Sequence, residues 1–232
     1  MRGMSILRSI CLLALGIAAA AYPQAQKEAA KRLETAAVVF DEVMSVSERA
    51  IPQSLLDKSK CVVVVPGLLK GAFIFGGKFG RGFVSCRAKS GVGWTAPAGV
   101  RVEGGSFGLQ VGGSESDVIM LVMNDRGAER LMSSKFTVGG DASAAAGPVG
   151  RTATAETDAT MRAEILTWSR SRGLFAGISL QGATMRHDTE ANQELYGSKL
   201  NNKEIVLGEK PVPEAAQKLI AALNKYSSRR SN

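Results

Sequence analysis

Apolar residues recur every three or four positions in several segments of the chain, the longest of which covers residues 27–45. There Leu33, Phe40 and Val43 fall on one face, with charged residues between them. Because this spacing matches the turn of an α-helix, it predicts a helix with one apolar face. Shorter helices are expected after Pro52, where proline fits a first helical turn, and at residues 125–133 and 214–226.

The pattern changes at Cys61, where runs of β-branched and aromatic residues bounded by glycine begin. Such runs predict strands. Glycine pairs between them permit bulges, tight turns or close backbone approach, which favours a strongly curved antiparallel sheet or a barrel. The expected strands cover residues 61–65, 72–75, 82–87 and 117–123, and a hairpin is expected from residues 165–169 and 174–180.

Together these patterns predict an α+β fold, a single domain whose curved, mainly antiparallel, barrel-like sheet is flanked by N- and C-terminal amphipathic helices. The expected boundaries are a signal peptide at 1–21, the folded domain at 22–208, and a C-terminal helix with a basic tail at 209–232. The chain without its signal is long enough to bury a substantial core.

The first residues have the layout of a secretory signal peptide. Arg2 and Arg8 precede an uncharged run at residues 9–21, and small residues indicate a peptidase site near Ala21, with cleavage after Ala25 as the alternative. This layout predicts export to the periplasm or beyond.

Cys11 raises the alternative of a lipid-modified anchor. It lies early in the apolar run and follows Arg8, whereas a lipoprotein signal places a leucine-like residue and small residues just before the cysteine. The run is also shorter than the roughly 20 residues that a membrane-spanning helix needs. Cleavage of the signal is therefore the expectation.

The formal net charge of +8 makes the chain basic, and it stays basic without the two arginines of the signal. Positive charge attracts phosphate-bearing surfaces. Export argues against nucleic acid as the partner, so anionic lipid headgroups are the better candidate. The alternative is a basic surface that only keeps the protein soluble.

Catalytic patterns are scarce. His187 is the only histidine, so a Ser-His-Asp triad or a histidine-based metal site would have to be built around it, and an envelope hydrolase would need it beside a nucleophile and an acid. A solvent-facing or capping role is expected for His187. The glycines of residues 77–82 lack the spacing of a nucleotide-binding loop. We therefore expect no enzyme activity, no cofactor and no metal.

Two cysteines, Cys61 and Cys86, remain after the signal. An oxidising compartment allows them to pair if their strands are neighbours. Two buried free thiols are the alternative, because cysteine is also a common small core residue.

The middle of the chain resembles the SYLF domain, from about Lys27 to about Gly197. The similarity rests on many short pieces in the expected order rather than on any single motif. They are Ile51-Pro52 with Leu55-Leu56, Val65-Pro66-Gly67, Phe75-Gly76-Gly77 with Gly80-Arg81-Gly82, Trp94-Thr95-Ala96-Pro97, Gly108-Leu109-Gln110-Val111-Gly112, Asp117-Val118-Ile119, Gly147-Pro148-Val149-Gly150-Arg151, Ser171-Arg172-Gly173-Leu174-Phe175-Ala176-Gly177, and Asn192 with Tyr196-Gly197.

The resemblance implies a module that binds membrane lipid. Eukaryotic SYLF proteins are selective for phosphoinositides, use an N-terminal amphipathic helix, and in some cases bind actin filaments, which export would put out of reach here. On this basis the chain is expected to bind anionic phospholipid or phosphoinositide headgroups at a membrane surface without catalysis. A structural or adaptor protein of the cell envelope, bound to another protein, is the alternative.

Applied to this sequence, the resemblance and the charge pattern single out cations in and near the first helix and the first strands. The expected lipid-binding residues are Lys27, Lys31, Arg32, Lys58, Lys60, Lys70, Lys78 and Arg81. The alternative for the first helix is that its apolar face packs on the sheet. Trp94 and Phe79 could insert at a membrane interface, but core packing is the expected role of both.

Overall fold

The computed structural model describes residues 22–46, 50–150, 162–171 and 174–228. The predicted signal peptide with Cys11, the final residue of the Gly147–Arg151 motif, the hairpin turn at 172–173 and the last four residues of the basic tail lie outside the described residues.

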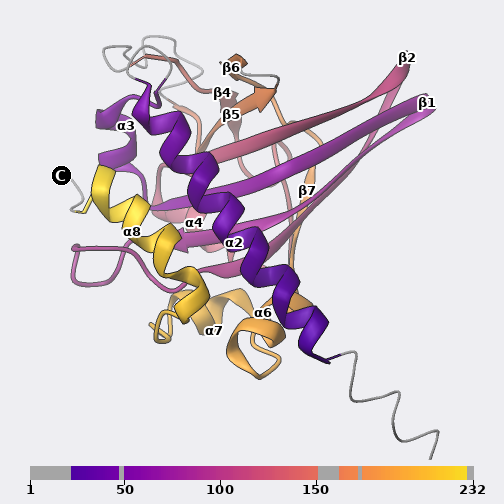
Figure 1. Cartoon of the computed structure of the whole chain (residues 1–232). Coiled ribbons are helices and arrows are strands. Elements are labelled where there is room, and N and C mark those ends of the chain that lie inside the picture. Colours follow the sequence, from indigo (N-terminus) through magenta and orange to yellow (C-terminus); the bar gives the residue numbers. More distant parts are fainter. Residues whose placement is uncertain (1–21, 47–49, 151–161, 172–173, 229–232) are drawn as a thin grey trace, which may run out of the picture.

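The described helices pack against a strand-rich region, from which two long strands project (Figure 1). The first is α2 (Tyr22–Ser45), which begins earlier than the expected residue 27, and α3 (Gln53–Lys58) follows Pro52 as predicted. The short α4 (Asp125–Leu131) lies within the expected segment. The remaining helices are α6 (Thr189–Tyr196), α7 (Asn202–Val206), the 3-10 turn η1 (Glu214–Ala216) and α8 (Gln217–Tyr226).

The sheet has seven strands and is dominated by two very long ones, β1 (Cys61–Cys86) and β2 (Ala98–Val122). These two pair antiparallel along nearly their whole length, from Cys61 opposite Val122 to Val84 opposite Ala98. The other strands are β3 (Lys135–Thr137), β4 (Ala144–Ala146), β5 (Ile165–Ser171), β6 (Leu174–Gly177) and β7 (Thr184–His187). The sheet order is β3-β7-β2-β5-β4, with β1 on β2 and β6 on β5. Among the described strands, β4 and β5 form the one parallel pair. The predicted α+β class with a curved, mainly antiparallel sheet is confirmed.

Strand β1 bends back so that its second half covers its first. An ideal Cβ on Gly82 would lie 2.1 Å from the carbonyl oxygen of Val64, and one on Gly80 would lie 2.6 Å from Cδ1 of Leu68. Residues 80–82 therefore lie directly on residues 64–68, and only glycine permits backbones to approach so closely. The three segments expected at 61–65, 72–75 and 82–87 are thus parts of one continuous strand.

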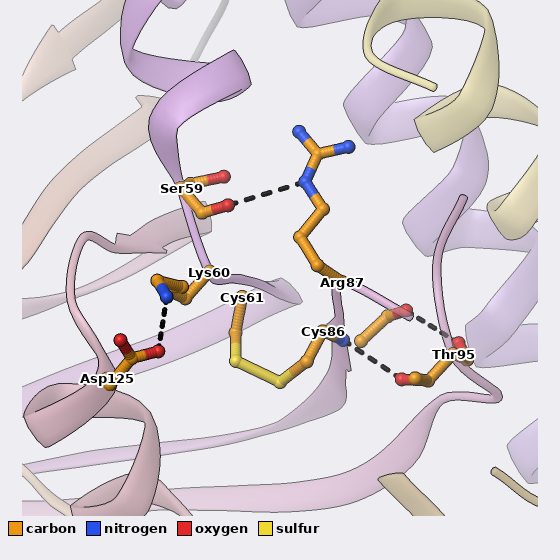
Figure 2. Close-up of a disulfide and its surroundings, with 8 residues drawn as sticks. Ser59, Lys60, Cys61, Cys86, Arg87, Thr95 and Asp125 are labelled. Carbon is orange, nitrogen blue, oxygen red and sulfur yellow. Dashed lines mark hydrogen bonds and ion pairs between the residues drawn. A yellow bond between two sulfur atoms is a disulfide. The ribbon is translucent and has the colours of Figure 1, made fainter. Parts of the chain in front are cut away.

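A disulfide joins the two ends of β1, where Cys61 and Cys86 lie side by side (Figure 2). The backbone N–H of Cys86 donates to the Thr95 hydroxyl, and Lys60 forms an ion pair with Asp125 next to the bridge. Of the two alternatives for these cysteines, the structure shows pairing. The bridge closes the base of the folded β1 strand.

The first residues of β1 are buried on both faces of the sheet. Val62 and Val64 belong to the core beneath α2, whereas Cys61, Val63 and Val65 belong to a second core inside the curve of the sheet. A strand with two buried faces has no polar alternation, which explains the uninterrupted valine run.

Helix α2 packs its apolar face, including Leu33 and Phe40, into the first core. Its long axis runs parallel to α8, since Lys218 pairs with Glu34 and Lys225 pairs with Asp41, seven residues further along both helices. The alternative in which the apolar face of the first helix packs on the protein is therefore the one observed. No helix within the described ranges is both long and apolar enough to cross a membrane.

Candidate functional site

Arg81 is the most strongly bound of the predicted site residues. Its guanidinium reaches from β1 to the N-terminus of α6, where Nε and Nη2 donate to the two carboxylate oxygens of Asp188 at 2.5 and 2.6 Å, and Nη2 also meets Glu190 at 2.9 Å. Asp188 is fully buried and also accepts from the backbone N–H of Ala191 as the N-cap of α6. Hydrogen bonding to Asp188 raises the pKa of Arg81 above its ordinary value. This fork-to-carboxylate pair anchors α6 to β1.

Arg32 lies close to Arg81, so the structure brings these two predicted residues together. Burial lowers the pKa of Arg32, with a further contribution from the charge of Arg81, while Asp188, Glu194 and Glu28 act in the opposite direction. Glu194 itself is partly buried, which raises its pKa, and it accepts from the backbone N–H of Ala29. Carboxylates therefore pair directly with Arg81 and offset the charge of Arg32 only in part.

The other predicted cations are dispersed. Lys60 pairs with Asp125, and Lys58 is exposed at the end of α3. Lys31 is exposed on α2, beside an open cleft between that helix, α6 and η1, and Lys27 lies near the start of α2. Among the described residues no carboxylate lies within ion-pair distance of Lys31 or Lys58.

Lys70 and Lys78 form the second pair that the structure brings together. Both are half-buried on β1, and Lys70 has its pKa lowered first by burial and then by the positive charge of Lys78. In the described part of the chain neither ammonium group has a carboxylate within 4.0 Å. Unlike the two arginines, this pair of positive charges is uncompensated.

The two aromatic residues considered for membrane insertion differ. Trp94 is buried, donates from Nε1 to the carbonyl of Ser227 at 2.8 Å and stacks under Arg87, which confirms core packing. Phe79 is 49% exposed, so its expected core position is wrong. Successive residues of a strand point to opposite faces of the sheet. Because Gly80 faces the interior, the adjacent Phe79 faces outward.

Residues of the recognised motifs serve mainly to hold the fold. Asn192 accepts from the backbone N–H of Gly99 and donates to Asn202, and the Tyr196 hydroxyl donates to the carbonyl of Pro97. Asp117 binds Arg170 and the backbone N–H of Gly67. These motifs therefore mark the architecture rather than a reactive centre.

His187 is half-buried in β7, near the backbone of Met132 and Ser133 directly after α4, and its Nε2 is buried without a hydrogen-bond partner among the described residues. The expected solvent-facing position is therefore not observed. Groups of three or more His, Cys, Asp or Glu side chains with metal-binding geometry are absent from the described ranges.

The titration of His187 provides a test of this placement. Burial lowers the folded-state pKa of His187 below its ordinary value, so the folded protein binds this proton less readily than the unfolded chain. The free energy of unfolding is then expected to fall as the pH drops from about 7 through the folded-state pKa. Because His187 is the only histidine, one imidazole NMR signal reports its pKa. A midpoint above about 6.5 would contradict the burial. In His187→Gln the pH dependence in this window should largely disappear.

Comparison with known proteins gives a family assignment. The family Ysc84, described as "Las17-binding protein actin regulator", matches residues 103–226, which begin in β2 and end with α8. The chain belongs to the Ysc84 family, the family of the SYLF domain. The predicted resemblance is confirmed.

Relatives of this Ysc84-family chain come from yeasts and animals. An SH3 domain-containing protein of Schizosaccharomyces pombe is 34% identical over 182 residues, 77% of this chain and 42% of that protein. Protein YSC84 of Saccharomyces cerevisiae is 34% identical over 181 residues, 76% of this chain and 38% of that protein. The human SH3 domain-containing YSC84-like protein 1 is 28% identical over 213 residues, 90% of this chain and 62% of that protein. The chain thus spans 38% to 62% of the length of these relatives, two of which are named for an SH3 domain.

Proposed function

We propose that this Ysc84-family chain is an exported, non-enzymatic protein that docks reversibly on anionic phospholipid at a membrane surface. The observation that carries the proposal is the set of predicted cations without compensating carboxylates in the described structure, Lys31, Lys58, Lys70 and Lys78. A lysine near an anionic membrane contributes roughly 1 kcal/mol, so several such residues give useful affinity.

Docking in this form does not require the first helix to leave the protein. Leu33 and Phe40 are fully buried, so insertion of the apolar face of α2 would expose the first core. The polar face of the helix, which includes Lys31, stays available while the helix is packed. We therefore propose electrostatic contact by the folded domain.

Flotation with vesicles tests the proposal. The mature protein should float with vesicles that contain phosphatidylglycerol or cardiolipin, should not float with pure phosphatidylcholine, and should lose roughly tenfold in affinity on a tenfold increase in salt because screening shortens the reach of surface charges. Failure to bind any anionic composition, or binding that salt leaves unchanged, would sink the proposal.

A variant that lacks two exposed lysines tests the same proposal. Lys31→Gln/Lys58→Gln should weaken binding by up to about 30-fold, the equivalent of about 2 kcal/mol for two lysines, whereas the folded state should be unaffected because both side chains are exposed. Arg32→Glu is a poor probe, since it would place a carboxylate beside Asp188 and Glu194 and destabilise the protein.

A second candidate is an envelope adaptor that binds another protein. The family description and the name LAS seventeen-binding protein 3, carried by a Saccharomyces cerevisiae relative 32% identical over 212 residues, favour it. An open cleft between α2, α6 and η1, lined by Leu195, Pro213 and Ala215, offers a place for a peptide. Vesicle binding that fails while a cross-linked envelope protein is recovered would support this candidate.

A further inference from the structure

The paired strands β1 and β2 project beyond the helix-covered body as a ribbon (Figure 1). Lys70 and Lys78 lie on β1 on either side of the far end of this ribbon, opposite Ser114 and Gly104 of β2. The ribbon end therefore lies beyond the helix-covered part of the sheet, and Lys70 and Lys78 flank it.

Strand parity places both lysines on the concave face. Leu68 belongs to the second core, and Lys70, two residues further, faces the same side. On the returning half of the strand an ideal Cβ of Gly80 points at Leu68 and Val65, so Lys78, two residues earlier, also faces inward. Burial and, to a lesser extent, the positive charge of Lys78 lower the pKa of Lys70, which agrees with the two ammonium groups lying on the same face.

On the concave face, the register partners of the two lysines are small. Gly104 lies across from Lys78, and Ser114 lies across from Lys70. The nearest carboxylates lie on the other face, because Glu103 pairs across from Phe79 and binds Arg186, and Glu115 pairs across from Leu69. Two like charges that share a half-buried space without an acid favour the binding of an anion.

A buried hydroxyl adds a second polar group on this face. Ser116 is the register partner of Leu68, so its side chain faces the same interior. Ser116 is buried, with an exposed fraction of 6%. Its Oγ has no hydrogen-bond partner among the described residues. Buried hydroxyls are normally satisfied, so an unsatisfied one beside Lys70 is consistent with a ligand or water that completes its bonding.

The convex face at the same level carries both apolar and acidic side chains, because Leu69 lies across from Glu115 and Phe79 lies across from Glu103. Leu69 and Phe79 are the immediate neighbours of the two lysines and are 53% and 49% exposed. Apolar side chains beside lysines are the arrangement that binds at a membrane interface, where the charges meet headgroups and the apolar groups enter the acyl boundary. A free phosphate would give no role to Leu69 and Phe79, so a lipid is the favoured source of the anion.

We propose that the end of the β1–β2 ribbon is a lipid-headgroup site in which Lys70 and Lys78 together bind the phosphate of a phosphomonoester lipid while Leu69 and Phe79 contact the membrane interface. The inference rests on the proposed function and assigns it to one site. Two ammonium groups match a phosphomonoester dianion better than the single charge of a phosphodiester, so phosphatidic acid is the probe and phosphatidylglycerol the comparison.

Vesicle titration with matched variants tests the site. Lys70→Gln/Lys78→Gln should bind phosphatidic acid vesicles about 30-fold more weakly than the wild-type protein, the equivalent of about 2 kcal/mol for two lysines. The control Lys203→Gln/Lys210→Gln removes the same charge from two exposed lysines near α7 and should stay within about threefold. Leu69→Ser/Phe79→Ser should weaken binding while leaving its salt dependence unchanged.

The outcomes separate the two proposals. Two results with a wild-type protein that binds vesicles would overturn the ribbon site while lipid docking stands. In one, Lys70→Gln/Lys78→Gln and the control Lys203→Gln/Lys210→Gln lose affinity equally. In the other, Lys70→Gln/Lys78→Gln binds as well as the wild-type protein. If the wild-type protein binds no vesicle, the proposed function fails. If inorganic phosphate perturbs the backbone NMR signals of Lys70 and Lys78 but vesicles do not, the lipid assignment is overturned. Removal of two mutually repelling charges should not lower the melting temperature, so loss of binding cannot be attributed to unfolding.

Discussion

Gly82→Ala is expected to lower the free energy of unfolding by about 3 kcal/mol, at the upper end of what overpacking costs. The new methyl group would lie 2.1 Å from the carbonyl oxygen of Val64 and 2.7 Å from the Cα of Val65. Both neighbours are backbone atoms of the same folded strand, so no side-chain rotation can relieve the clash. Denaturant unfolding followed by circular dichroism measures the loss.

Gly77→Ala is the matched control for this substitution. Gly77 lies in the same strand, and an ideal Cβ there meets no atom within 4 Å. Its stability should change by less than about 1 kcal/mol, since an unstrained Gly→Ala change acts chiefly on the unfolded chain. Equal losses in the two variants would contradict the close approach of the two halves of β1.

Removal of the disulfide is expected to cost a similar amount. The bridge between Cys61 and Cys86 closes a loop with a sequence separation of 25, and the chain-entropy estimate for a loop of that size is about 3 kcal/mol. Cys61→Ala/Cys86→Ala should show this loss in denaturant unfolding. Alanine avoids leaving an unsatisfied hydroxyl at two buried positions.

Reduction provides the control for the disulfide. Dithiothreitol should destabilise the wild-type protein by about the same amount and should leave the double variant unchanged. If the wild-type protein is equally stable with and without reductant, the bridge does not form or does not constrain the unfolded chain. Mass spectrometry with a thiol-blocking reagent distinguishes these two cases.

Local sequence patterns predicted the elements whose periodicity is regular. The spacing of Leu33, Phe40 and Val43 predicted α2, and the valine run after Cys61 predicted the start of β1, because both segments bury residues in a repeating order. The hairpin of β5 and β6 was also predicted, and its strands pair antiparallel from Trp168 to Ser171. These features depend on neighbours in the sequence.

Features that depend on distant contacts were not predictable. The glycines near residue 77 were interpreted as breaks between strands, whereas β1 continues through them and bends. Residues 98–116 were not predicted as a strand because glycine, serine and charged residues interrupt the β-branched pattern, and their pairing partner β1 supplies the stabilisation instead. The fork between Arg81 and Asp188 joins residues 107 positions apart.

The candidate site shows the same difference between features that local sequence predicts and features that distant contacts decide. The family resemblance and the charge pattern singled out eight cations. Only the structure distinguishes Lys70 and Lys78, which lie on one face without an ion-pair partner among the described residues, from Arg81, which pairs with Asp188. The alternation of Leu69 and Lys70 was the available sequence signal for an exposed apolar residue beside an inward lysine. It could not be interpreted without knowing which face of the strand is concave.

The parallel packing of α2 and α8 has a consequence for the order in which the protein folds. The apolar face of α2 is completed by Leu219 and Leu223, which follow it by almost 180 positions in the chain. A chain that emerges N-terminus first therefore carries an incompletely covered helix until its last elements are made, and contacts of such long sequence separation form slowly. The native state is thus completed late, after the last helix of the chain has been made.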